Sequence, residues 1–584
     1  MLKIVKYFHK TEWSLMFLGI FLIIVQVWLD LKLPDYMAEI TTLIQMEGTS
    51  VKELIKPGSS MLLCAIGSMM ASIIVCFTTA KIAAGLSKRL RGQIFEKTLS
   101  FSMEEMNRFS TASLITRSTN DITQVQLFIA MGLQVLIKAP ILATWAIVKI
   151  SNKSWQWTAA TGAAVFILIL MLTMIIVFAI PKFKMIQTLT DNLNRVTREN
   201  LTGLRVIRAY NAEKHQTEKF EKANNDLTNT NLFVSRLMVM VPPGMSLIMS
   251  GLSLSIYWIG AFIIHEAALE DRITLFSNMV VFTSYAMQVV IAFMMVSIVF
   301  VMLPRVSVSV KRILEVLETK TKIKDGTETK GNPKHAGEVE FKNVSFTYPG
   351  SAEPVLHNIS FKAQKGETVA FIGSTGSGKT TIVNLIPRFY DATEGEVLVD
   401  GINVKEYKQD ALHAKIGYVS QTAVLFSGTV ASNVALGSEM VSREAVKRAV
   451  EIAQGKEFVE KLDEQYNAAV AQGGANFSGG QKQRLSIARA IYRNPEIYIF
   501  DDSFSALDYK TDRALREALR NATRNATTLI VAQRIGTIKD ADQIIVLENG
   551  RIVGKGTHEQ LMESCKTYQE IAYSQLSKEE LNHG

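Results

Sequence analysis

The sequence of 584 residues predicts a helical membrane domain followed by an α/β domain in one chain. Three observations predict this architecture. Six long apolar segments fill the first half of the chain, a charged stretch punctuated by Gly and Pro follows, and short β-rich runs then alternate with helical patterns. With 48% hydrophobic residues, the chain is too apolar for a protein that is soluble throughout. The predicted boundaries are 1–317 for the membrane domain, 318–337 for a linker and 338–584 for the α/β domain.

The six apolar segments are predicted to be membrane-spanning α-helices. Five contain no charged residue, and each approaches or exceeds the ~20 residues that a helix needs to cross a bilayer. The third in chain order is interrupted by Lys138, which either extends its side chain to the inner membrane interface or faces a polar cavity; the first interpretation is favoured. The segments are Trp13–Leu29, Gly58–Ala80, about Leu127–Ile150, Ser154–Pro181, Leu237–Ile264 and Ile273–Pro304.

The distribution of basic residues predicts how the spans are oriented. If the N-terminus is cytoplasmic, the segments on its side contain twenty Lys and Arg residues and the loops on the opposite side contain six. By the positive-inside rule, the N-terminus and the α/β domain then face the cytoplasm, with the spans in contact with the lipids of the plasma membrane. The basic residues form no single tract, so the net charge of +9 does not indicate nucleic acid as a partner.

Two runs of small and capping residues interrupt the long loops predicted to be cytoplasmic. They cover Phe109–Arg117 and Ala209–Glu213. Either they are simple turns between helices, or they are short elements that dock on a soluble domain.

The α/β domain contains a phosphate-binding loop that directly follows the strand-like run Thr368–Ile372. The loop matches G-x-x-x-x-G-K-[ST], a pattern in which glycines allow backbone N–H groups to surround phosphate oxygens. Lys379 supplies a charge for the β- and γ-phosphates and Thr380 a hydroxyl for Mg²⁺, while the expected following helix directs its positive end at the anion. The chain is therefore predicted to bind ATP or GTP through Gly373, Ser374, Thr375, Gly376, Ser377, Gly378, Lys379, Thr380 and Thr381.

Two further segments belong with this loop. Ile497–Asp501 is predicted to be a buried strand that ends in a carboxylate, an arrangement by which an aspartate opposite a phosphate loop holds Mg²⁺ through water. The alternative is that Asp501 caps the following helix. Phe477–Gln481 places glycines at the start of a helix, where exposed backbone donors form another anion site.

Together, these ordered motifs resemble those of ATP-binding cassette (ABC) exporters, in which six spans of exporter type and one P-loop nucleotide-binding domain form a half-transporter. The resemblance covers nearly the whole chain. It implies that Tyr348 stacks on adenine, that Gln421 joins Thr380 and Asp501 in binding Mg²⁺, and that the two loop interruptions are coupling helices. It also implies that a second group of residues acts on ATP held by another cassette: Phe477, where the family usually has Leu, with Ser478, Gly479, Gly480, Gln481 and Asp508.

Two positions depart from the family pattern at the reaction centre. Asp502 stands where the family carries the glutamate that polarises the attacking water. It is shorter by one methylene, about 1.5 Å, whereas a general base must come within about 2.6–3.2 Å of the water. Gln533 stands at the usual switch histidine, and its amide can bond a γ-phosphate but cannot relay a proton at neutral pH. We therefore expect the chain's own site to hydrolyse ATP poorly.

The resemblance predicts the partner as well. Cassettes of this family act in head-to-tail pairs, so a homodimer would have two weak sites, whereas a heterodimer with a second half-transporter would combine a degenerate site with a competent one. This pattern resembles the heterodimeric multidrug exporters of Gram-positive bacteria. Methionine-rich spans favour hydrophobic small-molecule substrates, although ordinary packing is the default explanation of the methionines. Lipid or peptide export and a sensor that does not pump are the alternatives.

Overall fold

The structure, a computed structural model, divides into two compact units. The helical unit comprises Met1–Leu99 and Thr111–Thr319, and the α/β unit comprises Ser100–Ser110 and Lys320–Gly584. The short segment Ser100–Ser110 thus belongs with the α/β unit, although it lies in the first half of the chain. The described residues are 2–46, 50–151, 153–268 and 271–575.

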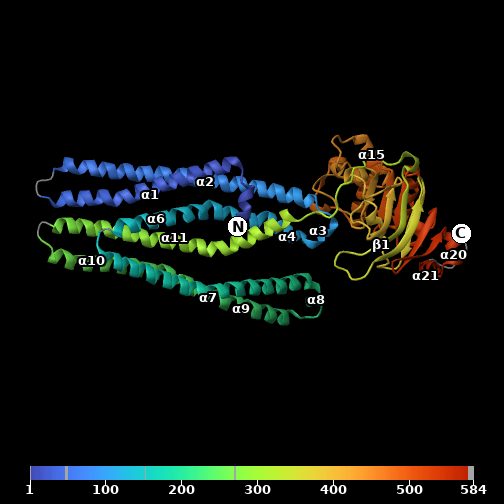
Figure 1. Ribbon diagram of the computed structural model, residues 1–584. Helices are drawn as coiled ribbons and strands as arrows, with labels where there is room; N and C mark the ends of the chain where they lie inside the picture. The colour runs from blue at the N-terminus through green and yellow to red at the C-terminus, as the bar shows by residue number, and fades with distance from the viewer. Residues whose placement is uncertain (1, 47–49, 152, 269–270, 576–584) are drawn as a thin grey trace. The chain divides into compact units, whose positions relative to one another are not determined.

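Long helices form the helical unit (Figure 1). Six described segments are long and apolar enough to span a membrane, which agrees with the six predicted spans. An α-helix suits this environment because it satisfies its backbone hydrogen bonds within one segment. Several helices continue well beyond their apolar part. The elements are η1 (Leu2–Tyr7), α1 (Lys10–Gln45), α2 (Val51–Leu99), α4 (Thr111–Thr116), η2 (Arg117–Asp121), α5 (Ile122–Leu127), η3 (Phe128–Gly132), α6 (Leu133–Ser151), α7 (Trp155–Thr202), α8 (Leu204–Ala209), α9 (Glu213–Val239), α10 (Val241–Glu266) and α11 (Arg272–Glu318).

An ion pair inside the helical unit corrects one prediction. The Lys138 ammonium on α6 lies 3.1 Å from the Asp30 carboxylate on α1. The favoured interpretation, in which Lys138 extends to the membrane interface, is therefore wrong. The ammonium instead pairs with a carboxylate supplied by a neighbouring helix, which lowers the cost of keeping a charge in an apolar segment.

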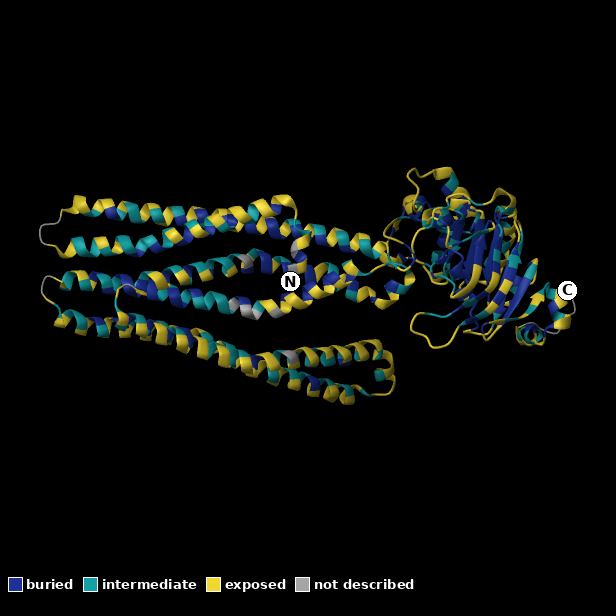
Figure 2. Ribbon diagram, viewed as in Figure 1, coloured by how far each residue is buried: buried dark blue, intermediate teal, exposed yellow. Residues whose placement is uncertain are grey.

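A six-stranded sheet forms the centre of the α/β unit. Its strand order is β12-β11-β3-β10-β9-β6, with five parallel strands and an antiparallel β12 at one edge. Every residue of β9 and β10 is buried, which explains why these strands read as continuous apolar runs (Figure 2). The bounds are β3 (Thr368–Gly373), β6 (Ile416–Val419), β9 (Ile497–Asp501), β10 (Thr527–Val531), β11 (Gln543–Glu548) and β12 (Arg551–Gly556).

A separate antiparallel sheet with the order β2-β1-β4-β5 was not predicted. The β-rich runs Val339–Phe341 and Glu396–Val399 indicate strands here, but strand pairing is decided by residues far apart in the chain. A short β7-β8 pair and several helices complete the unit. Their bounds are β1 (Val339–Phe346), β2 (Leu356–Ala363), β4 (Glu394–Val399), β5 (Ile402–Asn403), β7 (Gly428–Thr429), β8 (Ala469–Val470), η4 (Pro333–His335), α12 (Lys379–Leu385), α13 (Gln409–Ala414), α14 (Val430–Val434), α15 (Arg443–Ile452), α16 (Lys456–Glu460), η5 (Gln465–Asn467), η6 (Gln472–Gly474), α17 (Gly479–Arg493), α18 (Tyr509–Ala522), α19 (Ile535–Ile538), α20 (His558–Ser564) and α21 (Lys566–Gln575).

A short helix from the first half of the chain, α3 (Met103–Arg108), is part of the α/β unit. Asn107 donates a hydrogen bond of 3.0 Å to the Tyr390 hydroxyl, and the Lys322 backbone N–H donates to Glu105 at 3.1 Å. The predicted docking element Phe109–Arg117 begins directly after this helix, and its first two residues, Phe109 and Ser110, belong to the α/β unit; its docking role stays a prediction. The second interruption is an exposed turn between α8 and α9, and its role stays a prediction.

Candidate nucleotide site

The carboxyl ends of four neighbouring parallel strands bring the predicted site residues together. Gln421 follows β6, Asp501 ends β9 and Gln533 follows β10, while β3 leads into the phosphate loop. Parallel strands end at the same edge of a sheet, which is where α/β proteins form their ligand sites. Residues separated by up to 160 positions therefore meet because of strand order alone.

The phosphate loop has the backbone geometry that its glycines allow. Gly376 and Gly378 have φ values of +84° and +96°, in the left-handed region. The Lys379 ammonium donates to the carbonyl oxygens of Gly373 and Ser374, both at 2.8 Å, so it lies over the loop. Burial lowers the pKa of Lys379, an effect that the charges of Asp502 and Asp501 oppose. A phosphate would therefore be received by backbone donors and a positioned cation.

The residues beside the loop fit a magnesium ion. The Thr380 hydroxyl donates to Asp501 Oδ1 at 2.9 Å, so two hard oxygen ligands are adjacent. Burial raises the pKa of Asp501, and the nearby charge of Asp502 raises it further. A cation bound beside Asp501 would oppose both effects and lower this pKa. Mg²⁺ is usually bound by few protein ligands together with water and phosphate, and a threonine hydroxyl beside one carboxylate is such a small ligand set.

Asp502 is held by the two glutamines of the site. Gln533 Nε2 donates to Asp502 Oδ2 at 2.9 Å, and Gln421 Nε2 donates to the same oxygen at 3.3 Å. Asp502 is buried with a φ of +47°, and its backbone N–H is bonded to Val531. Burial raises the pKa of its carboxyl, although the glutamine donors oppose the shift. The backbone and one carboxylate oxygen are therefore both fixed.

A cavity of about 280 Å³ lies beside the loop. Several predicted residues line it. Of the predicted phosphate and Mg²⁺ ligands, four do not: Gly373, Ser374, Ser377 and Asp501. Tyr348, the Phe477–Gln481 segment and Asp508 also lie outside its lining. Asp501 is nearly inaccessible, at 2% exposure, and contacts the cavity-lining Thr380. The lining residues are Val355, Thr375, Gly376, Gly378, Lys379, Thr380, Thr381, Gln421, Asp502, Val531 and Gln533.

Tyr348, the predicted adenine-stacking residue, contacts the loop through its hydroxyl. Its oxygen lies 3.0 Å from Thr381 Oγ1. The ring packs edge-on against Tyr390 at a centroid distance of 5.3 Å. Tyr390 is also the residue that accepts from Asn107 of α3. The predicted base-binding aromatic is therefore one ring away from α3.

The Phe477–Gln481 segment forms the start of α17. Ser478 caps the helix by accepting from the Gln481 backbone N–H at 3.3 Å, and the Gln481 side chain accepts from the Ser478 backbone N–H at 2.9 Å. Ser478 and Gly479 are exposed, whereas Phe477 is buried against Phe458. Asp508 similarly caps α18 by accepting from the backbone of Thr511 at 2.9 Å. These predicted residues are thus preorganised by helix capping.

Sequence reasoning missed two residues, Tyr418 beside Asp501 and Arg484 on α17. Tyr418 on β6 donates to Asn384 at 3.0 Å and lies 3.5 Å from Asp501 Oδ2. Burial raises its pKa, so it stays protonated and able to donate. Its position three residues before Gln421, at the end of a strand, was the available signal. Arg484, the other residue, donates to the Gln454 carbonyl at 2.7 Å and lies 4.7 Å above the Phe458 ring.

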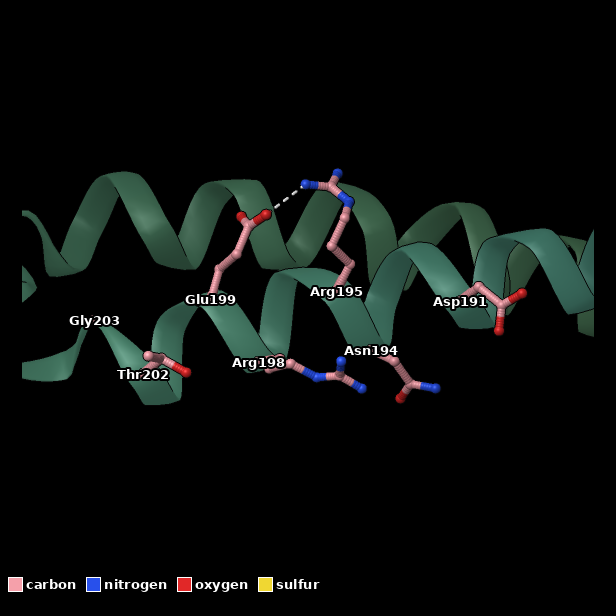
Figure 3. Close-up of a pocket in the computed structure, with 7 residues that line it drawn as sticks. All are labelled: Asp191, Asn194, Arg195, Arg198, Glu199, Thr202 and Gly203. Carbon is pink, nitrogen blue, oxygen red and sulfur yellow. Dashed lines mark hydrogen bonds and ion pairs between the residues drawn. The ribbon is translucent and has the colours of Figure 1, made fainter. Parts of the chain in front are cut away.

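A second, wider hollow of about 700 Å³ lies along α7 (Figure 3). It has exposed polar walls, and Arg195 pairs with Glu199 at 2.7 Å. It contains neither a glycine-rich loop nor a buried carboxylate. The features predicted for a nucleotide site are therefore those of the smaller cavity. The lining of the wider hollow is Asp191, Asn194, Arg195, Arg198, Glu199, Thr202 and Gly203.

Comparisons with known proteins agree with this geometry. The chain matches the family model of the ABC transporter transmembrane region over residues 16–304 and that of the ABC transporter over 356–505. An uncharacterized ABC transporter ATP-binding protein of Mycobacterium tuberculosis is 39% identical over 88% of this chain and 86% of the relative. YfiB, an ABC transporter ATP-binding protein of Bacillus subtilis, is 35% identical over 89% and 90%.

More distant matches are informative in different ways. An ATP-dependent lipid A-core flippase of Pseudomonas fluorescens is 31% identical over 83% of this chain and 79% of the relative. The structure of a bacterial Atm1-family ABC exporter with ATP bound matches with a TM-score of 0.79, at 22% identity, over 98% of this chain and 100% of that chain. That likeness shows the fold. The chain belongs to the ABC transporter family and is a half-transporter, in which a helical membrane region with the exporter-type fold is fused to an ATP-binding cassette.

Proposed function

We propose that this chain is one subunit of a heterodimeric ATP-driven efflux pump and that its own ATP site is degenerate. The observation that carries the proposal is the Asp502 carboxylate bonded at one oxygen by both Gln533 and Gln421. A general base must reach the attacking water and accept its proton. Asp502 is one methylene shorter than glutamate and already accepts two hydrogen bonds, so it is poorly suited to that role.

The same site is well suited to retaining nucleotide. The loop amides and Lys379 would hold the phosphates, Tyr348 would face the base, and Thr380 and Asp501 would hold Mg²⁺. The Gln421 amide nitrogen bonds Asp502, which leaves its oxygen as the atom that would bind the ion. When bound, Mg²⁺ neutralises charge on the β- and γ-phosphates. ATP at this site would therefore act mainly as a structural ligand.

The capped start of α17 supports a role on a second cassette. Ser478 and Gly479 are exposed at a helix N-terminus, where backbone donors and the helix dipole favour a phosphate. In a head-to-tail pair, this segment would complete the partner's ATP site, with the hydrolytic glutamate and histidine supplied by that partner. Asp508 would lie at the same junction. The chain would thus contribute to hydrolysis without performing it at its own loop.

Pumping would follow from a shift between two conformations. ATP binding would favour closed cassettes and an outward-facing membrane region, and hydrolysis at the partner's site would reset the pair. The excess of basic residues in the segments on the N-terminal side supports a cytoplasmic cassette. The apolar spans favour hydrophobic drugs or related amphiphiles as substrates.

The decisive experiment compares the two sites in the co-expressed pair. Replacing the partner's hydrolytic carboxylate by an amide should lower ATP turnover about 100-fold or more, because general-base catalysis contributes that much. Asp502→Asn should lower turnover by much less, about threefold at most. A larger loss from Asp502→Asn than from the partner's change would overturn the assignment. A homodimer as active as the co-expressed pair would overturn the requirement for a different partner.

Lipid export is the second candidate, because relatives 30–31% identical are named lipid A-core flippases. Reconstituted pairs distinguish the two candidates by whether lipid or drug stimulates ATP turnover. A sensor that does not pump is the third candidate, and it predicts ATP binding without vectorial transport of either compound. The preorganised Phe477–Gln481 segment argues against it, since that segment has a use only beside a competent partner site.

A further inference from the structure

A side chain from α21 holds the backbone beside Gln533. Residues 532–534, here called the switch segment, join the end of β10 at Val531 to the start of α19 at Ile535. Gln575, at the end of α21 (Figure 1), bonds this backbone twice. Gln575 Nε2 donates to the Gln533 carbonyl oxygen at 2.8 Å, and Gln575 Oε1 accepts from the Ile535 backbone N–H at 2.9 Å. One amide group therefore bonds the chain on both sides of Arg534.

One of these two bonds has a purely structural explanation. The first N–H groups of a helix have no partner within that helix and need acceptors from elsewhere. The side chain of Arg534, the residue before α19, makes no capping hydrogen bond within the described chain. Gln575 supplies an acceptor to Ile535 from 40 residues away. On this explanation, Gln575 only stabilises the start of α19.

The bond to the Gln533 carbonyl is not explained by capping. The start of a helix presents unpaired N–H groups, so a bond to a carbonyl that precedes the helix satisfies none of them. What this bond fixes is the backbone of Gln533. The Gln533 side chain lines the nucleotide cavity and donates to Asp502 Oδ2 at 2.9 Å. Gln575 is therefore connected to the nucleotide site through a single residue.

The helix that carries Gln575 is anchored in the cassette core. Tyr568 and Ala572 are fully buried and lie on the same face of α21 as Gln575, at spacings of four and three residues. The Tyr568 hydroxyl lies 2.7 Å from His558 Nδ1 on α20. The helix also contacts α19, β3 and β11. The exposed Gln575 side chain is therefore presented to the switch segment from a well-packed element.

We propose that Gln575 is a positioning residue for recognition of the γ-phosphate at this chain's ATP site. By holding the Gln533 carbonyl, it keeps the Gln533 amide at the cavity. That amide nitrogen has two hydrogens, so the bond to Asp502 leaves one to donate to the terminal phosphate of ATP. ADP lacks this phosphate, and the contact therefore favours ATP over ADP. The inference rests on the proposed retention of ATP at this site and concerns how that ATP is recognised.

The test compares the affinities of ATP and ADP for the intact heterodimer. The partner's phosphate-loop lysine is replaced by alanine so that only this chain's site binds nucleotide tightly, and Mg²⁺ is omitted so that ATP stays intact. We expect Gln575→Ala to lower the preference for ATP over ADP about fivefold, the typical effect of one hydrogen bond. Gln575→Glu separates the two bonds, because a carboxylate can accept from Ile535 but cannot donate to Gln533. It should keep the thermal stability of the wild type and still lose the preference.

Two further variants control for general effects. Gln569→Ala is the matched control, since Gln569 is also on α21 and donates to a backbone carbonyl, that of Met562, at 2.7 Å. It should keep the wild-type preference. In a Gln533→Ala background, Gln575→Ala should lower the preference no further. A general electrostatic effect or a loosened cassette would act in both backgrounds.

Four results would overturn the proposal: a preference unchanged by Gln575→Ala, a preference kept by Gln575→Glu, an equal loss in Gln569→Ala, or the same loss in the Gln533→Ala background. ATP turnover of the same heterodimer with Mg²⁺ restored tests the proposed function separately. Fast turnover with a preference that depends on Gln575 would overturn the degenerate site and keep the positioning role. Slow turnover with a preference independent of Gln575 would keep the degenerate site and overturn the positioning role.

Discussion

Gln533 donates a hydrogen bond of 2.9 Å to Asp502, so the two departures from the family pattern are direct neighbours. The pairing is chemically complementary, since a carboxylate only accepts and a glutamine amide donates without changing charge. It also links the end of β10 to the end of β9 at the rim of the nucleotide cavity. The two residues are therefore best tested as a unit.

Restoring both family residues should activate this chain's own site. We expect Asp502→Glu together with Gln533→His to raise its ATP turnover about 100-fold, because the longer carboxylate reaches the water and histidine can relay a proton. Asp502→Glu alone should give a smaller rise in ATP turnover. ATP turnover is measured in a heterodimer in which the partner's hydrolytic carboxylate has been replaced by an amide. Asp410→Glu, on the exposed surface of α13, is the control, and a double variant no faster than it would contradict the prediction.

The buried Asp502 carboxyl should make cassette stability depend on pH. Burial raises its pKa above the unfolded value, so its contribution to folding is fully present below the unfolded pKa and is lost as pH rises through the folded pKa. Asp502→Asn, which stays neutral, should therefore stabilise the nucleotide-free cassette at neutral pH, and this gain should vanish on acidification. Amide hydrogen exchange of Ile497–Asp501 measures this gain in stability. A gain that persists at low pH, or that exposed Asp410→Asn reproduces, would refute the electrostatic explanation.

The hydrogen bond between Asn107 on α3 and Tyr390 should affect the coupling of ATP turnover to transport. Tyr390→Phe removes the 3.0 Å hydrogen bond from Asn107 and keeps the ring that packs on Tyr348. A typical net contribution is about 1 kcal/mol, so exchange protection of Met103–Arg108 should fall about fivefold and less substrate should be transported per ATP. Tyr573→Phe, at an exposed position on α21, is the matched control. If Tyr390→Phe and Asn107→Ala have fully additive effects, the two side chains are not coupled.

Arg484 should be needed for hydrolysis at the partner's site. Its guanidinium joins the start of α17 to the Gln454 carbonyl and lies over the Phe458 ring. Arg484→Met removes both contacts, which together contribute about 1–2 kcal/mol, and should lower ATP turnover about tenfold. Arg484→Lys should restore little of the lost ATP turnover because lysine lacks the planar guanidinium. Arg493→Met, at the exposed end of the same helix, should keep normal turnover; an equal loss there would point to general destabilisation.

The sequence by itself determined the features that depend on neighbouring residues. Apolar runs of about twenty residues predicted six spans, and the spacing of Gly373, Gly378, Lys379 and Thr380 predicted the phosphate loop. Buried parallel strands were readable for a related reason, because a strand covered on both faces is apolar throughout. These patterns depend on neighbouring residues and not on how distant parts of the chain pack.

Only the tertiary structure decided which distant groups meet. Lys138 and Asp30 are 108 residues apart, and Asn107 and Tyr390 are 283 apart, so no local pattern predicts either contact. The antiparallel β2-β1-β4-β5 sheet was missed for the same reason. Asp502 and Gln533 were recognised separately in the sequence, but their bond exists because β9 and β10 are parallel neighbours. Sequence supplied the residue types, and strand order and helix packing brought them together.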